Sequence, residues 1–223
     1  MNFNHIYIVG LGALGVMYGA QIEAHTPKDT LHFIANKQRQ QRYNQEGIYC
    51  NNELCKFEYT ASGDEAPVAD LLVFAVKAGA LAAAIQDARF VVWPNTLILS
   101  VLNGISSEEE LCKAFGPEKV IPCVVQGMDA TKNKNKLTYT KLGTISFGEV
   151  NCEVSRRVKA LEAYLHSAGL YPDVRTDIMR HMWSKFMLNC GVNQAAAVYE
   201  TNHGGLQTPG PARPAMLAAL GEV

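Results

Sequence analysis

Short apolar runs separated by segments of helical character form the first two thirds of the chain. Continuous apolar runs of this kind, ended by polar residues or glycine, are typical of strands that are buried on both faces of a parallel sheet. The predicted strands cover residues 6–9, 31–35, 70–77, 96–102 and 120–125. The predicted helices between them cover residues 16–22, 38–46, 79–88 and 108–115. This alternation predicts an α/β fold with a parallel sheet.

Later segments have a different pattern. Residues 48–60 contain two short β-like pieces around Asn51-Asn52, which predict an antiparallel excursion at the sheet edge. Residues 137–139 and 144–147 predict a closing antiparallel pair, and the charged stretch 132–136 predicts a solvated turn. Residues 152–168 and 177–195 predict two helices, the second with an apolar surface typical of a buried helix.

A glycine motif, Gly10-x-Gly12-x-x-Gly15, lies between the first predicted strand and the first predicted helix. In a dinucleotide-binding turn the first glycine permits the turn, the second lets the backbone approach a pyrophosphate, and the third packs helix against strand. Two alternatives stay open: the glycines serve packing alone, or they hold another nucleotide-like ligand such as S-adenosylmethionine. A signal peptide is disfavoured because no Lys or Arg precedes the apolar run.

The end of the second predicted strand bears on the choice of cofactor. Sites that prefer NAD place an acid there to hold the ribose 2′-hydroxyl, whereas a 2′-phosphate requires cations or neutral donors. Here Asn36, Lys37 and Arg39 follow the strand, and no acid occurs before Glu46. The sequence therefore favours NADPH, although the two cations are also compatible with an ordinary solvated helix start.

Polar residues end two further predicted strands. Lys77 follows one apolar run and Asn103, with Gly104 after it, follows the next. Ligands of open α/β sheets bind beyond the carboxyl ends of the strands, so both residues are candidates for a site. The alternatives are a solvated lysine and a plain Asn-Gly turn.

Three polar residues interrupt the apolar surface of the helix predicted at residues 177–195. Lys185, Asn189 and Asn193 recur every fourth position and so form one slowly drifting stripe. Burying an ammonium and two amides without partners is costly. The stripe either finds partners elsewhere in the protein or lines a polar substrate cleft, where a lysine is suited to proton transfer.

Composition excludes several classes of protein. The 223 residues carry 20 Lys plus Arg against 21 Asp plus Glu, a formal net charge of −1 that gives no long-range attraction to nucleic acid or acidic membranes. Six cysteines include no Cys-x-x-Cys pair, so neither zinc nor another metal is expected. The longest uncharged run, 90–107, contains Pro94 and Asn103 and is not a membrane span. We expect a soluble, cytoplasmic protein.

Over essentially its whole length the sequence resembles the ketopantoate reductases (2-dehydropantoate 2-reductases). The motifs that carry the resemblance are the glycine motif, Val76-Lys77, Asn103-Gly104, and Trp183-Ser184-Lys185 followed by Asn189 and Asn193. The resemblance implies NADPH-dependent reduction of a small 2-oxo acid, with ketopantoate as the first candidate. A related 2-oxo acid and a non-catalytic NADP-binding module are the alternatives.

The resemblance also implies roles for individual residues. Lys185 is the expected general acid, and Asn189, Asn193 and Asn103 are expected to bind substrate. The expected cofactor-binding residues are Gly10, Leu11, Gly12, Ala13, Leu14, Gly15, Asn36, Lys37, Lys77 and Asn103. In the family an arginine commonly meets the 2′-phosphate after the second strand, and Asn36 occupies that place here.

The resemblance finally implies a domain plan. Residues 1–175 are expected to form a Rossmann-type NADP-binding domain, and residues 176–223 the start of an all-helical substrate domain. Family members are longer, and their helical domain supplies a serine and a glutamate for which no matching positions exist in this sequence. We therefore expect a truncated C-terminal domain, and a homodimer is among the expected assemblies.

Overall fold

The computed structural model describes residues 2–28 and 30–223. Its internal contacts divide the chain into two compact units. The sheet unit comprises Met1–Leu102 and Ser106–Ile178, and the helical unit comprises Asn103–Ile105 and Met179–Val223.

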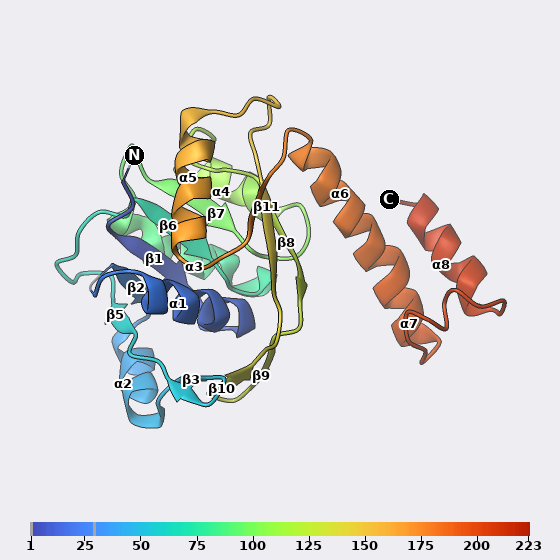
Figure 1. Ribbon diagram of the computed structural model, residues 1–223, viewed down its shortest axis with the longest axis horizontal. Coiled ribbons are helices and arrows are strands. Elements are labelled where there is room, and N and C mark those ends of the chain that lie inside the picture. The colour runs from blue at the N-terminus through green and yellow to red at the C-terminus, as the bar shows by residue number, and fades with distance from the viewer. Residues whose placement is uncertain (1, 29) are drawn as a thin grey trace. The chain divides into compact units, whose positions relative to one another are not determined.

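A parallel sheet of five strands forms the centre of the sheet unit (Figure 1). Its strands, in spatial order, are β5 (Glu58–Thr60), β2 (Leu31–Ile34), β1 (Ile6–Val9), β6 (Leu71–Phe74) and β7 (Leu97–Ser100). In the central strand Ile6 lies opposite Leu31 on one side and Leu71 on the other. The chain leaves β1 toward β2 and later returns to the other side of β1 as β6, so the strand order reverses beside β1. The predicted α/β, Rossmann-type architecture is confirmed.

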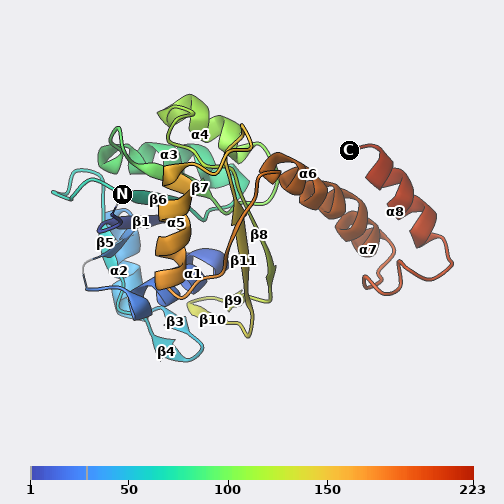
Figure 2. The ribbon, with the colours of Figure 1, turned by 45° about the horizontal axis from the view of Figure 1, so that its top comes forward.

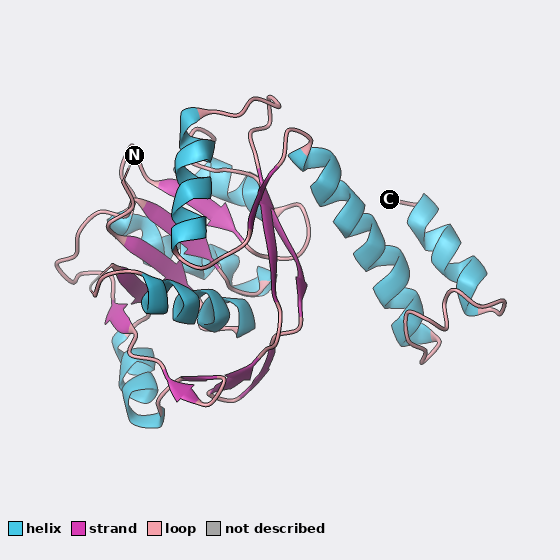
Figure 3. Cartoon of the chain, viewed as in Figure 1, coloured by secondary structure: helices cyan, strands magenta, loops and turns pink. Residues whose placement is uncertain are grey.

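Alternate side chains of these strands enter two separate cores, because successive residues of a strand point to opposite faces. Ile8 and Phe33 belong to the core beneath α1 (Ala13–His25) and α5 (Arg156–Ser167). Tyr7 and Phe74 belong to the core beneath α3 (Leu81–Ala88) and α4 (Ser107–Phe115). Helices therefore cover both faces of the sheet, as Figure 3 shows. This double burial explains why the strands are continuously apolar.

Two smaller sheets complete the sheet unit (Figure 2). One has the order β12 (Pro172–Val174), β11 (Leu142–Phe147), β8 (Cys123–Met128). The other has the order β4 (Glu53–Leu54), β3 (Tyr49–Cys50), β10 (Lys136–Thr138), β9 (Thr131–Asn133). The predicted antiparallel pair of residues 137–139 with 144–147 is therefore wrong: β10 pairs with β9 and β3, and β11 pairs with β8 and β12.

Two further β predictions need correction. Within residues 48–60, β3 and β4 form the predicted antiparallel pair, but this pair belongs to the small sheet and not to the edge of the main sheet, which β5 joins in parallel. The strand predicted at 120–125 begins only at Cys123, and Val120 makes an isolated bridge to Ile98. Pro122 lies between them and has no N–H for a strand ladder, which explains the delay.

Most of the helices that follow the glycine motif begin and end close to the predicted residues. α2 (Lys37–Glu46) ends at Gly47, whose N–H donates to the Tyr43 carbonyl and whose φ of 67° suits glycine. Two 3₁₀ turns, Ala78–Ala80 and Arg89–Val91, flank α3. The helix predicted from residue 152 begins only at Arg156, because the Ser155 hydroxyl accepts a hydrogen bond from the Val158 N–H (3.2 Å) and caps the first turn.

The helical unit consists of one long interrupted helix and one shorter helix. Its elements are α6 (Ile178–Leu188), a π-helical turn (Asn189–Asn193), α7 (Gln194–Val198) and α8 (Ala212–Gly221). A Cβ on Gly191 would lie 2.5 Å from the Leu220 side chain, so the absence of a side chain lets α8 pack against the π turn. The helix prediction for residues 177–195 holds except for this turn.

The expectation that α6 and α7 form a buried helix is wrong for this chain. Trp183, Leu188 and Val198 are 45%, 50% and 76% exposed. Among residues 2–28 and 30–223 there is no helix with both the length and the apolar character to cross a membrane.

Candidate functional site

The three glycines connect β1 to α1 through a turn that few other residues could adopt. Gly10 has a φ of 108°, and a Cβ there would lie 2.6 Å from the Ala75 carbonyl oxygen. A Cβ on Gly15 would lie 1.9 Å from the Gly10 carbonyl oxygen. At Gly12, in contrast, a Cβ would contact only the Ala75 oxygen, at 3.4 Å. Gly10 and Gly15 are thus required for packing, whereas Gly12 leaves open space above the backbone.

The start of α1 suits an anion. The first intrahelical bond runs from the Val16 N–H to the Gly12 carbonyl (3.1 Å), so the amides of Ala13, Leu14 and Gly15 have no acceptor within the helix. Gly12 offers no capping side chain, and the first turn contains no acidic residue that would compete for these donors. The partial positive charge of the helix start adds to the attraction for a phosphate. The residues present therefore fit a dinucleotide pyrophosphate.

Asn36 and Lys37 lie at the carboxyl end of β2, as predicted, but both have partners within the chain. The Asn36 side-chain oxygen accepts the Arg39 N–H (2.9 Å) and caps α2. The Lys37 ammonium donates to both oxygens of Asp64, at 2.7 and 2.8 Å. Sequence reasoning missed Asp64, because it follows β5 and comes close only where β5 pairs with β2.

A cavity of about 380 Å³ adjoins the glycine turn at Leu11. Arg42, Lys132 and Lys134 line it together with Tyr43, and the Arg42 guanidinium stacks on the Tyr43 ring at 5.0 Å. Burial lowers the pKa of Lys132, and the nearby Arg42 lowers it further. The stretch 132–136 is thus more than a solvated turn, since it brings cations beside the predicted phosphate site. In the sequence, the charged stretch 132–136 was the feature that could have indicated these cations.

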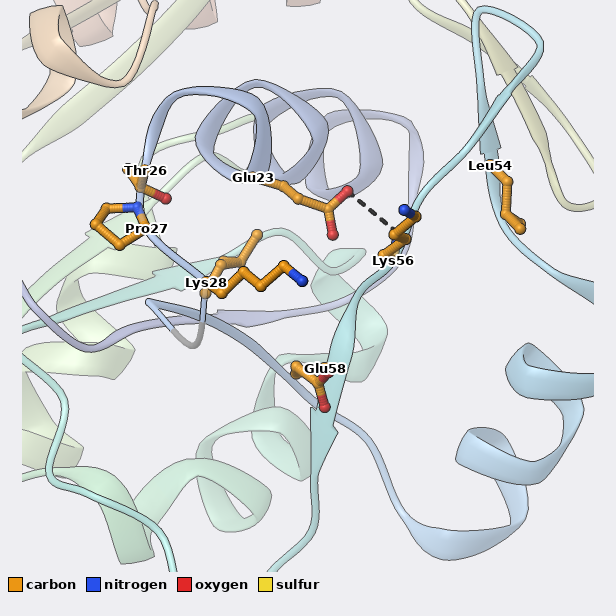
Figure 4. A pocket seen from close by; sticks show the side chains of 8 residues that line it. Glu23, Thr26, Pro27, Lys28, Leu54, Lys56 and Glu58 are labelled. Atoms are coloured by element: carbon orange, nitrogen blue, oxygen red, sulfur yellow. Dashed lines mark hydrogen bonds between the residues drawn. The ribbon is translucent and has the colours of Figure 1, made fainter.

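A second cavity, of about 400 Å³, lies at the amino ends of β2 and β5 (Figure 4). It includes the first residues of β2 and β5, Leu31 and Glu58, and is therefore remote from the strand ends that carry the predicted cofactor residues. Within it the Lys56 N–H donates to the Glu23 carboxylate (3.1 Å), and burial raises the pKa of Glu23. None of the residues predicted from sequence lines this cavity.

Lys77 and Asn103 follow the carboxyl ends of β6 and β7, as predicted. Lys77 is exposed, and its carbonyl accepts the Ala80 N–H (2.8 Å) in the 3₁₀ turn. Asn103 begins the short segment that belongs to the helical unit, and Gly104 after it has a φ of 101°. The predicted residues that follow β1, β2 and β6 consequently share the carboxyl edge of one sheet.

The predicted stripe of Lys185, on α6, and Asn189 and Asn193, in the π turn, forms contacts within the helical unit. The Lys185 ammonium donates to the Asn103 side-chain oxygen at 2.9 Å. The Asn193 amide donates to the Asn189 side-chain oxygen at 3.1 Å, across the π turn. Lys185 and Asn189 are half-buried, and Asn193 is exposed. Residues 82 positions apart in the sequence are thus brought together into a lysine–carboxamide pair suited to binding an oxygen-rich small molecule.

A metal site finds no support among the described residues: within 2–28 and 30–223, no three His, Cys, Asp or Glu residues are grouped so that they could hold a metal ion. The polar groups predicted from the sequence are backbone amides, lysines and carboxamides. These groups bind and orient anions and oxygen atoms, and a lysine can also donate a proton.

Comparison with known proteins places these features in context. Residues 6–151 match the sequence model of the family "Ketopantoate reductase PanE/ApbA". A 2-dehydropantoate 2-reductase of Aquifex aeolicus is 24% identical over 204 residues, which are 89% of this chain and 64% of that protein. The chain spans about 60% of the length of the curated relatives that it matches.

Solved structures show the same fold. The 2-dehydropantoate 2-reductase of Geobacter metallireducens is 25% identical with a TM-score of 0.74, covering 88% of this chain and 66% of that one. A D-mandelate dehydrogenase solved with NADH and anilino(oxo)acetate is 21% identical with a TM-score of 0.76, covering 93% of this chain and 68% of that one.

Proposed function

The chain belongs to the ketopantoate reductase PanE/ApbA family, and from this premise we propose that it acts in the NADPH-dependent reduction of 2-dehydropantoate (ketopantoate) to pantoate, a step of pantothenate and coenzyme A synthesis. The observation that carries the proposal is the 2.9 Å hydrogen bond from Lys185 to Asn103. It joins the predicted proton donor to a predicted substrate-binding amide.

Lys185 is the proposed general acid. Its ammonium holds a proton next to the Asn103 oxygen, and it would donate that proton to the substrate oxygen that becomes the alcohol. The same positive charge would stabilise negative charge as it develops on that oxygen. Asn103, Asn189 and Asn193 would hold the carboxylate and hydroxyl groups of the substrate through their amides. The nicotinamide cofactor, when bound, supplies the hydride.

The proposed cofactor is NADPH, with residues 1–175 as the nucleotide-binding domain and residues 176–223 as the beginning of the substrate domain. The open space above Gly12 and the amides of the first turn of α1 support pyrophosphate binding. Leu11 would contact the nucleotide from the same turn, and Lys77 would lie near the nicotinamide. The cations Arg42 and Lys132 beside this turn support a 2′-phosphorylated nucleotide, and Lys37, at the start of α2, would lie at the ribose.

The test is an NADPH oxidation assay with ketopantoate and a panel of 2-oxo acids, with NADH run in parallel. Lys185→Ala should lower turnover by about a hundredfold to ten-thousandfold, the range for loss of a general acid, and should leave NADPH binding nearly unchanged. Lys141→Ala removes an exposed lysine from the sheet unit and is the matched control. Undiminished turnover of Lys185→Ala would refute the assignment.

A second candidate is reduction of a different 2-oxo acid. The structural likeness to a D-mandelate dehydrogenase, solved with NADH and anilino(oxo)acetate, favours including aryl 2-oxo acids in the panel. A third candidate is an NADP-binding module without catalysis, which would bind NADPH yet oxidise it with no 2-oxo acid. Cytoplasmic location and a homodimer complete the proposal, and sedimentation of the purified chain would test the latter.

A further inference from the structure

The ion pair between Lys37 and Asp64 lies at the position that determines nucleotide selectivity in dinucleotide-binding sheets. Lys37 is the first residue of α2, directly after β2. Asp64 lies in the turn after β5, the strand next to β2. The carboxyl ends of these two parallel strands lie side by side, so the turn brings a carboxylate to the end of β2 although the sequence there contains none.

Asp64 is held firmly in this position. Its Oδ2 accepts the Ala61 N–H at 2.9 Å, and its own N–H donates to the Ala61 carbonyl at 3.0 Å. Both carboxylate oxygens lie within 2.8 Å of the Lys37 ammonium. The hydrogen bond from Lys37 is the main cause that lowers the pKa of Asp64, so the carboxylate is charged at neutral pH.

The pair contributes little to the stability of the fold. The Lys37 side chain is 67% exposed, and ion pairs that are this open to water contribute little to folding. The pair does, however, change the charge and the hydrogen-bond acceptor that a bound nucleotide would contact. A free lysine would present one positive charge to a 2′-phosphate, whereas the pair presents no net charge and adds a carboxylate that can accept a hydrogen bond from a 2′-hydroxyl.

We propose that Asp64 determines the nucleotide selectivity of this chain: by pairing with Lys37 it weakens the binding of a 2′-phosphorylated nucleotide and allows a nucleotide with a free 2′-hydroxyl to bind as well. Asp64 acts through Lys37 and is a positioning residue for the nucleotide. This inference rests on the proposed dinucleotide function of the sheet unit. It concerns binding and requires no turnover.

Equilibrium binding of NADPH and NADH to the 223-residue chain tests the inference, with nicotinamide fluorescence as the signal. Asp64→Asn keeps the shape and the acceptor for Ala61 but removes the charge. It should tighten NADPH about tenfold, as expected when a carboxylate next to a phosphate is neutralised, and change NADH less than about threefold. The gain should shrink at high salt, because screening weakens exposed charges.

Three further variants test whether the change in NADPH affinity depends on the charge of Asp64 and on its pairing with Lys37. Asp64→Glu retains the charge and should keep the original ratio of the two affinities, whereas Lys37→Met should weaken NADPH more than NADH. Glu109→Gln breaks a comparable exposed pair on α4, where Glu109 accepts from Lys113 at 2.7 Å, and should change neither affinity. An unchanged or decreased preference for NADPH in Asp64→Asn would overturn the inference.

The outcome also separates this inference from the proposed function. Nucleotide binding with the expected selectivity change but without reduction of any 2-oxo acid would refute the proposed reaction and support the role of Asp64. Failure of the unmodified chain to bind either nucleotide would overturn both.

Discussion

Alanine substitutions at three glycines separate the packing role of the glycine turn from its proposed binding role. A Cβ on Gly15 would lie 1.9 Å from the Gly10 carbonyl oxygen, and side-chain carbons essentially never approach closer than 3.0 Å. Backbone on both sides must therefore move by about 1 Å, which places the cost near the upper end for overpacking, about 3 kcal/mol. For a chain of this size that corresponds to a fall in melting temperature of about 6–12 °C.

Gly12→Ala should behave differently. Its φ of −72° suits any residue, and the added Cβ would contact only the Ala75 oxygen at 3.4 Å. We expect a change in unfolding free energy within about 1 kcal/mol, since alanine is a poorer helix cap than glycine but also restricts the unfolded chain. The methyl group would occupy the space through which a phosphate approaches the backbone amides. Losing one charge-assisted hydrogen bond, about 2 kcal/mol, weakens NADPH about thirtyfold.

Thermal unfolding with and without NADPH measures both effects at once. At a concentration of 100 times its Kd, NADPH should raise the unfolding free energy of the unmodified chain by about 2.7 kcal/mol, and this gain should largely disappear in Gly12→Ala. Gly79→Ala is the matched control, because a Cβ there meets nothing within 4 Å. Unweakened NADPH binding by Gly12→Ala would refute the phosphate-binding role, and an unchanged melting temperature of Gly15→Ala would refute the packing argument.

Two predictions concern stability and pH. Glu149 accepts two hydrogen bonds from Arg157, at 2.7 and 2.5 Å, and this pairing lowers its pKa; Glu149→Gln should reduce the unfolding free energy by about 2 kcal/mol at pH 7. The contribution of Glu149 is present above the unfolded-state pKa of about 4.3 and is lost as pH falls through its lower folded-state pKa, so urea unfolding of the two forms should converge at acid pH. Hydrogen bonds from the Thr140 side chain and then from the Lys141 and Thr140 amides lower the pKa of Asp129 to about 2. Its contribution to stability is therefore complete above about pH 4 and lost toward pH 2, and carboxyl titration by NMR would contradict this if the Asp129 signal titrated near 4.

Most strands of the main sheet could be predicted because the residues that determine them are close together in the sequence. A strand such as β6 is apolar on both faces, and the glycines after β1 are required by contacts that any tight strand–helix turn creates. Chain order then places the residues that follow each strand at one edge of the sheet. For that reason the sequence alone suffices to predict that Asn36, Lys37 and Lys77 lie at the same edge of the sheet as the glycine turn.

The remaining features depend on pairing between distant segments, which local patterns do not record. The short strand β10 has the same alternation whether it pairs with β11 or with β9 and β3; in the structure it pairs with β9 and β3, and Leu137 is fully buried there. Asp64 reaches Lys37 only because β5 pairs with β2. The period of α6 and α7 gave no sign of the π turn, because positions four apart remain neighbours on both kinds of helix.

That π turn, Asn189–Asn193, makes the winding of the long helix depend on a single residue. Removing one residue from the turn would let α6 and α7 continue as one regular helix and would nearly keep the direction of the side chains that follow, because a π turn accommodates one residue more than an α turn. Ala195, which is buried with Leu206 and Ala212, would stay in that cluster, and Asn193 would follow Asn189 at a spacing of three, which keeps both side chains on one face of the helix. Relatives that lack one residue in this turn are therefore expected to have a regular helix here and to keep the packing of the last helix.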